Sequence, residues 1–160
     1  MNKEYGNIFR LARKEAGLTQ EVATGLLLIK DRTTLGRYEN DQVVPNDDMV
    51  FQMMHAYGAK WLGYEYLRTY TKIGKAILPP IYRRKVGHLT LMFKKECDDL
   101  EDIQRDLVRM AYDDEITEDE EEDWRSSTKE IEEVVGAGMS LLLTEIKKPS
   151  QDCSLVRANA

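Results

Sequence analysis

The sequence predicts an all-α protein made of a head of short helices followed by a long antiparallel helical hairpin. In the first half, Gly17, Pro45 and Gly58 interrupt the apolar pattern at the spacing of a bundle of four or five short helices. The tandem prolines Pro79 and Pro80 prevent a helix from continuing through them. Beyond them, two long segments each carry an apolar stripe at helical spacing, which favours two helices packed together.

Composition limits the class of protein. The chain has 160 residues, of which 42% are hydrophobic and 32% charged, a balance typical of a folded globular protein. No apolar run approaches the ~18 residues that a membrane span requires. The N-terminus has no basic stretch followed by an apolar core, so no export signal is indicated and we expect a cytoplasmic protein.

The residues that usually carry catalysis or bind metals are sparse. Cys97 and Cys153 lie far apart, and neither His55 nor His88 has a second ligand at a recognisable spacing. No nucleophile with a base, paired carboxylate or phosphate-binding glycine loop is evident. We therefore expect no enzyme activity, no metal and no cofactor.

The expected hairpin consists of helices over about 81–112 and 118–147. The second is expected to begin at a capping box, Thr117 to Glu120. The acidic run 113–123 lacks the alternating ligands and turn glycine of an EF-hand, so calcium binding is not expected. The predicted stripes are Val86, Leu89, Phe93, Leu100, Ile103, Leu107 and Met110 on the first helix, with Cys97 beside them, and Trp124, Ile131, Val134, Val135, Leu141, Leu142 and Ile146 on the second.

Two roles remain open for this hairpin. It has more apolar positions than one helix pair needs, among them Met92, Val108, Met139 and Leu143. They indicate either oligomerisation or packing of the hairpin onto the head of the same chain. The net charge of −6 is concentrated here, since residues 1–80 carry 11 Lys and Arg against 9 Asp and Glu, whereas residues 81–160 carry 12 against 20. The polar tail 149–160 is expected to be disordered.

The head should begin with a helix over about 5–16 that buries Ile8, Leu11 and Ala12 and stops at Gly17. Thr19 is a candidate N-cap for the second helix. The second helix is expected to bury Val22, Ala23, Leu26 and Leu27.

The third helix, over about 31–39, is the candidate for DNA recognition. Asp31 is its expected N-cap, Leu35 and Tyr38 its buried side, and Arg32, Thr33, Gly36 and Arg37 its open side. Arginine can donate two hydrogen bonds to guanine in the major groove, and threonine can contact a thymine methyl or a phosphate.

The order of these segments carries a family resemblance. Residues 10–20 read RLARKEAGLTQ, residues 32–40 read RTTLGRYEN, and Pro45, Tyr57-Gly58 and Trp61-Leu62-Gly63-Tyr64 follow. Over about residues 5–68 this resembles the Xre/Cro-type helix-turn-helix family, the fold of phage repressors. The resemblance implies a five-helix, repressor-like DNA-binding head at 1–68. The prolines and the apolar stripes add a connector at 69–80 and the hairpin at 81–148, whose surplus apolar residues favour an oligomerisation domain. From the end of the head onward, residues 62–68, 74–79 and 106–120 resemble a subgroup of such regulators from Gram-positive bacteria and mobile elements.

The resemblance also implies roles for individual residues. Gln20 would hold a phosphate, Arg32, Thr33 and Arg37 would face base edges, and Asn40 would contact the DNA backbone. Lys30 and Thr34 complete the predicted DNA-binding set. Arg13 and Glu39 would form a buried ion pair that orients the third helix.

The segment before the third helix departs from the usual spacing. Val22 and Ala23 come one residue early, and about two extra residues precede Leu35. Either the second helix extends through Leu28, or the turn around Ile29 and Lys30 is reshaped.

The leading hypothesis is a sequence-specific transcriptional regulator that binds double-stranded DNA as a homodimer. The alternative is a protein-interaction module of the antitoxin or anti-repressor type on the same scaffold. Whether a small molecule binds is left open.

Overall fold

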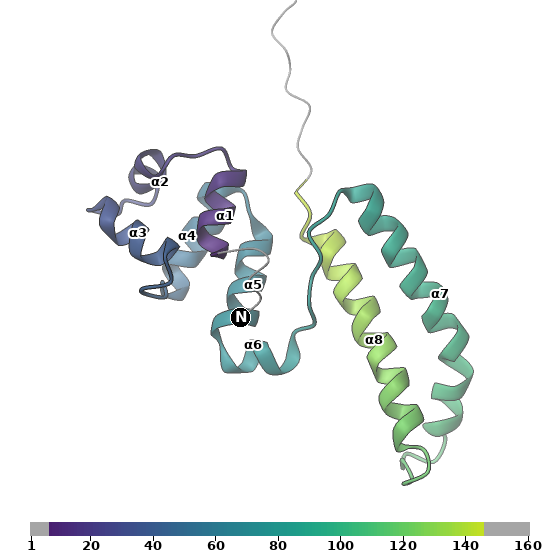
Figure 1. Ribbon diagram of the computed structural model, residues 1–160. Coiled ribbons are helices and arrows are strands. Elements are labelled where there is room, and N and C mark those ends of the chain that lie inside the picture. The colour runs from purple at the N-terminus through teal and green to yellow at the C-terminus, as the bar shows by residue number, and fades with distance from the viewer. Residues whose placement is uncertain (1–6, 146–160) are drawn as a thin grey trace, which may run out of the picture.

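The computed structural model describes residues 7–145, and all regular structure in this range is helical (Figure 1). The predicted all-α class is therefore confirmed. The predicted disordered tail, Ile146 and Cys153 lie outside the described residues, as does the expected helix start at Tyr5. None of the described helices combines the length and the apolar character needed to cross a membrane. The helices are α1 (Ile8–Glu15), α2 (Gln20–Leu26), α3 (Arg32–Glu39), α4 (Asp47–Tyr57), α5 (Lys60–Tyr70), α6 (Lys72–Ile77), α7 (Val86–Met110) and α8 (Glu121–Leu142).

Short polar side chains start the first four helices. Asn7, Thr19, Asp31 and Asn46 each accept a hydrogen bond from a backbone N–H in the first turn of the helix that follows. The N-caps predicted at Thr19 and Asp31 are thus confirmed. Helix α1 begins at Ile8 because the side chain of Asn7 caps it by accepting from the Arg10 N–H.

Each of these four helices ends at a residue in the left-handed conformation, namely Gly17, Leu28, Asp41 and Gly58. The next backbone N–H then bonds to the carbonyl five residues back, for example from Ile29 to Thr24 at 3.1 Å. This is the Schellman arrangement, which satisfies carbonyls at a helix end. The predicted stop at Gly17 is confirmed. The second helix does not extend through Leu28, because α2 ends at Leu26 and Leu28 has a left-handed φ of 51°. The turn around Ile29 and Lys30 is therefore the reshaped segment.

The core of the head is built around Phe9, Leu35, Met53 and Leu62, each at most 1% exposed. Ala12 and Ala23 are fully buried, so α1 and α2 present small residues to this core. The predicted burial of Val22 and Leu26 is wrong, since they are 51% and 55% exposed. Because α2 has only seven residues, its buried side is limited to Ala23 and to Leu27 one turn later.

The segment predicted as a connector contains a helix. Helix α5 continues past the predicted boundary at residue 68 to Tyr70, and α6 occupies 72–77. Thr71 separates the two, because its Oγ1 accepts from the Gly74 N–H at 2.9 Å and caps α6. Residues 78–85 then lead to the hairpin without regular structure.

Helices α7 and α8 form the expected antiparallel hairpin and extend away from the head (Figure 1). Both are shorter than predicted. Residues 81–85 form no helix, so α7 begins at Val86. In the capping box, the Glu120 carboxylate accepts from the Thr117 N–H at 3.1 Å, but these residues form a turn and α8 begins only at Glu121.

The buried side of α8 consists of small residues, Ser127, Gly136, Ala137 and Ser140. The predicted apolar stripes are wrong at their exposed members, which are Val86, Ile131, Val135 and Leu142 at 59%, 38%, 46% and 75%. For the three residues of α8, the reason is a second contact made by this helix. A Cβ on Gly136 would lie 2.6 Å from the Pro80 carbonyl, and Ser140 Oγ accepts from the Tyr82 N–H at 2.8 Å. Because α8 turns its small residues toward the segment after the prolines, its aliphatic residues remain outside.

One end of the hairpin is attached to the head. Ile81 and Leu143 pack against the core of the head, and Arg83 lies 3.7 Å above the Trp61 ring while forming an ion pair with Glu15. Of the two roles left open for the hairpin, packing onto the head thus applies to this end. The rest of α7 and α8 extends away from this attached end (Figure 1).

Replacing Leu28 by glycine should stabilise the protein by about 1 kcal/mol. Leu28 is 89% exposed, so little packing is lost, whereas glycine removes the cost of a left-handed leucine. The free energy of unfolding in urea measures the change, with Leu28→Ala as the matched control that keeps the strained backbone. An equal or lower stability of Leu28→Gly relative to Leu28→Ala would contradict the assigned turn.

Candidate nucleic-acid interface

Helix α3 presents a sharply divided surface. Leu35 and Glu39 are buried, whereas Arg32, Thr33 and Arg37 are exposed on the opposite side. The side chain of Asp31 caps the helix by accepting from Thr33, whose hydroxyl and backbone N–H lower the pKa of this carboxyl. The capped N-terminal turn is therefore ordered, with Arg32 and Thr33 at its outer edge.

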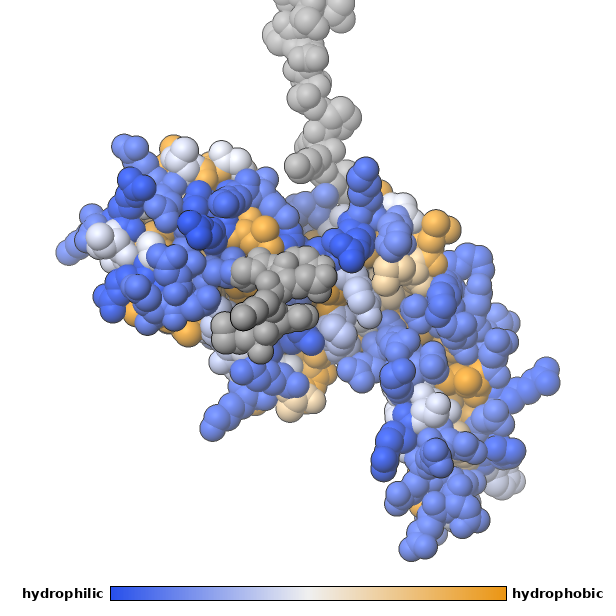
Figure 2. All heavy atoms as spheres, in the orientation of Figure 1, coloured by the Kyte–Doolittle hydropathy of each residue, from blue (hydrophilic) through white to orange (hydrophobic). Residues whose placement is uncertain are grey.

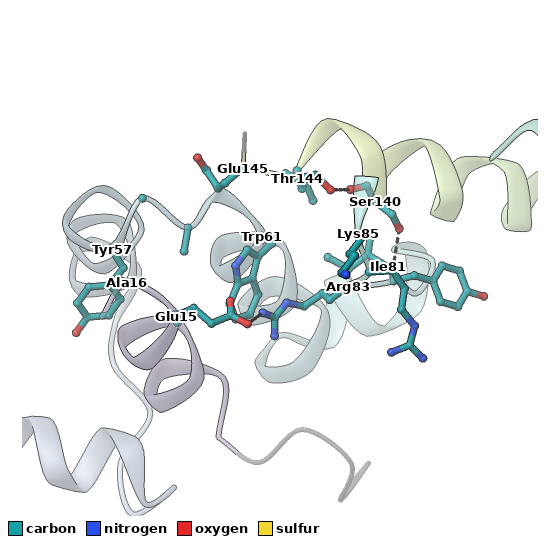
Figure 3. A pocket seen from close by; sticks show the side chains of 16 residues that line it. Glu15, Ala16, Tyr57, Trp61, Ile81, Arg83, Lys85, Ser140, Thr144 and Glu145 are labelled. Atoms are coloured by element: carbon teal, nitrogen blue, oxygen red, sulfur yellow. Dashed lines mark hydrogen bonds and ion pairs between the residues drawn. The ribbon is translucent and has the colours of Figure 1, made fainter. Parts of the chain in front are cut away.

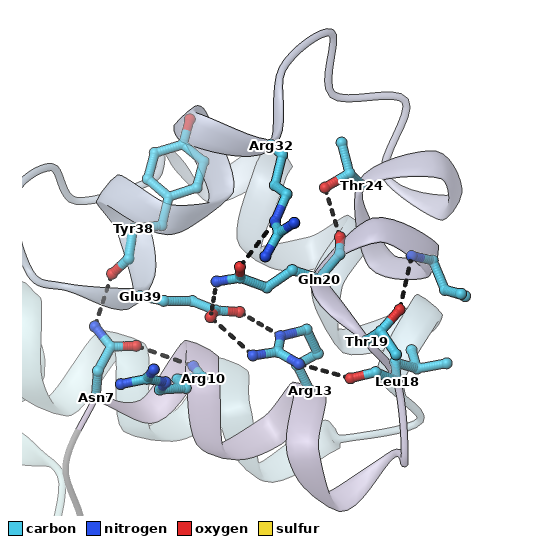
Figure 4. Close-up of polar contacts among 11 residues, drawn as sticks. Asn7, Arg10, Arg13, Leu18, Thr19, Gln20, Thr24, Arg32, Tyr38 and Glu39 are labelled. Carbon is cyan, nitrogen blue, oxygen red and sulfur yellow. Dashed lines mark hydrogen bonds and ion pairs between the residues drawn. The ribbon is translucent and has the colours of Figure 1, made fainter.

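A buried ion pair holds α3 against α1. Arg13 Nε and Nη2 donate to the two carboxylate oxygens of Glu39 at 2.5 and 2.9 Å (Figure 4). Arg13 Nη1 also donates to the carbonyl of Leu18 at 2.6 Å, so the same guanidinium fixes the turn between α1 and α2. The ion pair implied by the family resemblance is confirmed.

The surroundings of this pair favour the charged form of Arg13. Arg13 is 7% exposed and Glu39 2%, and the hydrogen bonds to Glu39 are the main cause that raises the pKa of Arg13. Beside them, burial and the Glu39 carboxylate raise the pKa of Tyr57, which keeps this phenol neutral. Removing one member of such a pair leaves an uncompensated buried charge, at a cost of about 3–5 kcal/mol.

A second anchor fixes the C-terminal end of α3. Asn7 Nδ2 donates to the Tyr38 carbonyl and to Asp41 Oδ1, both at 2.7 Å, and the Tyr70 hydroxyl donates to the same oxygen at 2.9 Å. Tyr70 in turn stacks on Phe9. The roles of Asn7, Phe9, Asp41 and Tyr70 were not predicted from the sequence. An Asn directly before an apolar-periodic helix is an N-cap signal that could have identified Asn7.

Gln20 lies between the ion pair and the exposed face of α3. Its Nε2 donates to Glu39 Oε2 at 2.8 Å, and its Oε1 accepts from Arg32 Nε at 3.2 Å (Figure 4). The side chains of Arg13, Glu39, Gln20 and Arg32 are thus linked in a chain from the core to the surface. The position of the exposed Arg32 is set by this chain and not by the acidic hairpin.

The predicted DNA-binding residues fall into three groups by their environment. Lys30, Arg32, Thr33, Arg37 and Asn40 are exposed, Thr34 is half-buried, and Gln20 is half-buried within the polar chain. All except Gln20 lie on α3 or within two residues of its ends, and Gln20 is joined to α3 through Arg32.

Charge is divided between the two parts of the chain. Residues 7–85 carry 13 Lys and Arg against 8 Asp and Glu, whereas residues 86–145 carry 6 against 19. Helix α3 lies on the side of the head away from the hairpin (Figure 1). A polyanion would therefore be attracted to the head and repelled by the hairpin.

Comparison with known proteins identifies the head. Residues 9–61, about a third of the chain, match the family model described as Helix-turn-helix. No curated protein and no solved structure showed a significant match to the chain. The head therefore carries a helix-turn-helix domain of the kind found in DNA-binding regulators, and the match spans α1 to the start of α5.

Proposed function

We propose that the protein is a sequence-specific transcriptional regulator that inserts α3 into the major groove of DNA. The observation that carries this proposal is the exposed face of α3, with Arg32, Thr33 and Arg37 outward, held from behind by the Arg13–Glu39 pair. A helix supported from one side and rich in donors on the other suits base edges. The residues assigned to DNA are Gln20, Lys30, Arg32, Thr33, Thr34, Arg37 and Asn40.

The residues divide by expected role. Arg32, Thr33 and Arg37 contact base edges, while Lys30 and Asn40, at the two ends of α3, contact phosphates. Gln20 already holds Arg32, so a phosphate bound at Gln20 would fix Arg32 at the same time. Thr34 is half-buried and contributes less direct contact.

Each of Arg32→Ala and Arg37→Ala should weaken binding to a DNA fragment selected from a random-sequence library by about 5- to 150-fold, the loss of about 1–3 kcal/mol expected for a base contact. Fluorescence anisotropy at several salt concentrations measures the affinity, which should fall steeply as salt rises. The matched controls are Arg105→Ala and Arg125→Ala, exposed arginines of the hairpin. Circular dichroism should show that all four variants remain folded.

Two results would contradict the proposal. One is unchanged affinity in both α3 variants, and the other is binding that does not respond to salt. Failure of the native chain to select any DNA would instead favour a protein-interaction role for the same scaffold.

We further propose that a second copy of the chain covers an exposed apolar face of the hairpin. Ile131, Val135 and Leu142 follow one another at steps of four and seven residues, so they lie on one side of α8, and all are exposed. Figure 2 shows hydrophobic patches within an otherwise hydrophilic hairpin surface. A homodimer would present two α3 helices to half-sites about one DNA turn apart, ~34 Å.

Val135→Glu should shift the native chain from dimer to monomer, because a carboxylate would be buried at the proposed interface. Sedimentation velocity measures the change, and Ile73→Glu, at an exposed apolar residue of α6, is the control that should leave the dimer intact. Added salt should strengthen the dimer, since it screens the repulsion between two acidic hairpins. A native chain that sediments as a monomer, or a Val135→Glu dimer, would contradict the assignment.

A further inference from the structure

A cleft of about 870 Å³ lies between the head and the base of the hairpin (Figure 3). The end of α1, the α4–α5 junction, residues 81–85 and the end of α8 form its walls. Its volume is within the ~300–1,000 Å³ range of small-molecule sites. None of the residues assigned to DNA lines it, so it is separate from the proposed interface.

The cleft contains a positioned planar cation. The Arg83 guanidinium lies over the Trp61 ring and is ion-paired with Glu15, which fixes its place in the wall (Figure 3). The Arg83 side chain is still 21% exposed, so part of it remains accessible from the cleft. A guanidinium stacks well on flat conjugated groups. Apolar walls beside it come from Ala16, Ile81 and Leu143.

The lining of the cleft is net positive, because three cations, Arg83, Arg84 and Lys85, stand against two carboxylates. Of its two carboxylates, Glu15 is paired with Arg83, and Glu145 accepts from the Lys60 backbone N–H at 3.3 Å. Lys85 also lines the cleft and forms no ion pair with any residue in the range 7–145. Figure 3 shows Arg83 and Lys85 on the same short segment, two residues apart.

We propose that this cleft binds a planar organic anion, an aromatic carboxylate, with its ring against Arg83 and the apolar wall and its carboxylate on Lys85. A bound molecule would touch α1, α5 and α8 together, and would therefore hold the head and the hairpin at one angle. By fixing that angle, the anion changes the affinity of the protein for DNA. This regulatory effect rests on the proposed function, whereas binding of the anion does not.

Binding can be tested on the full chain without DNA. The chain has two tryptophans, so Trp124→Phe leaves the Trp61 indole N–H as a single NMR reporter beside the cleft. The probes are benzoate, phenylacetate and indole-3-acetate, each paired with its neutral amide. The carboxylates should shift the Trp61 signal saturably, and the amides should bind about tenfold more weakly because they lack the charge-assisted bond to Lys85.

Lys85→Gln in the same background should reduce carboxylate affinity to that of the amides, whereas Lys75→Gln, at an exposed lysine of α6, should not change it. The absence of a saturable shift for every carboxylate overturns the site. Equal binding of acids and amides, or unchanged binding by Lys85→Gln, overturns the assigned anion contact.

Regulation of DNA binding by the anion is measured separately. Addition of a bound carboxylate at saturation should change the DNA affinity of the native chain but not that of Lys85→Gln. Unchanged affinity of the native chain overturns regulation while leaving the binding site in place.

Discussion

The buried pair between Arg13 and Glu39 is the contact on which the proposed interface depends. It joins α1 to the end of α3, and through Leu18 it also fixes the turn that leads into α2. Gln20 extends the same set of hydrogen bonds to Arg32 at the surface. Because a buried ion pair tolerates little displacement of either partner, the direction of the exposed arginine is tied to the packing of the core.

The division of charge explains how an acidic protein can have a head suited to the proposed DNA binding. The excess of acidic residues lies on the hairpin, and the hairpin extends from the side of the head away from α3. The field of the hairpin would orient the chain with α3 toward DNA. Arg83, Trp61 and Leu143 attach the base of the hairpin to the head, so a change at that joint would alter the angle between the hairpin and the head that carries α3.

Much of the head could be predicted from the sequence because its signals are local. Thr19 and Asp31 are N-caps by residue type, and Gly17 marks a left-handed helix end. Leu28 and Asp41 adopt the same conformation without a glycine. Asp41 is held by Asn7 and Tyr70 from other segments, whereas Leu28 is exposed and adopts it within the turn after α2. In the hairpin, apolar periodicity predicted the two helices correctly, but it predicted the wrong face of α8 to be buried. The burial of Gly136 and Ser140 depends on the approach of Pro80 and Tyr82, which helical periodicity does not contain.

The most direct test of the account is to map the DNA contact on the full chain by NMR, following backbone amide signals during titration with the selected DNA fragment. Signals of Gln20 and residues 30–40 should shift first and most, while those of the acidic segment 113–123 should not move. Large shifts in the hairpin with residues 30–40 unperturbed would contradict it.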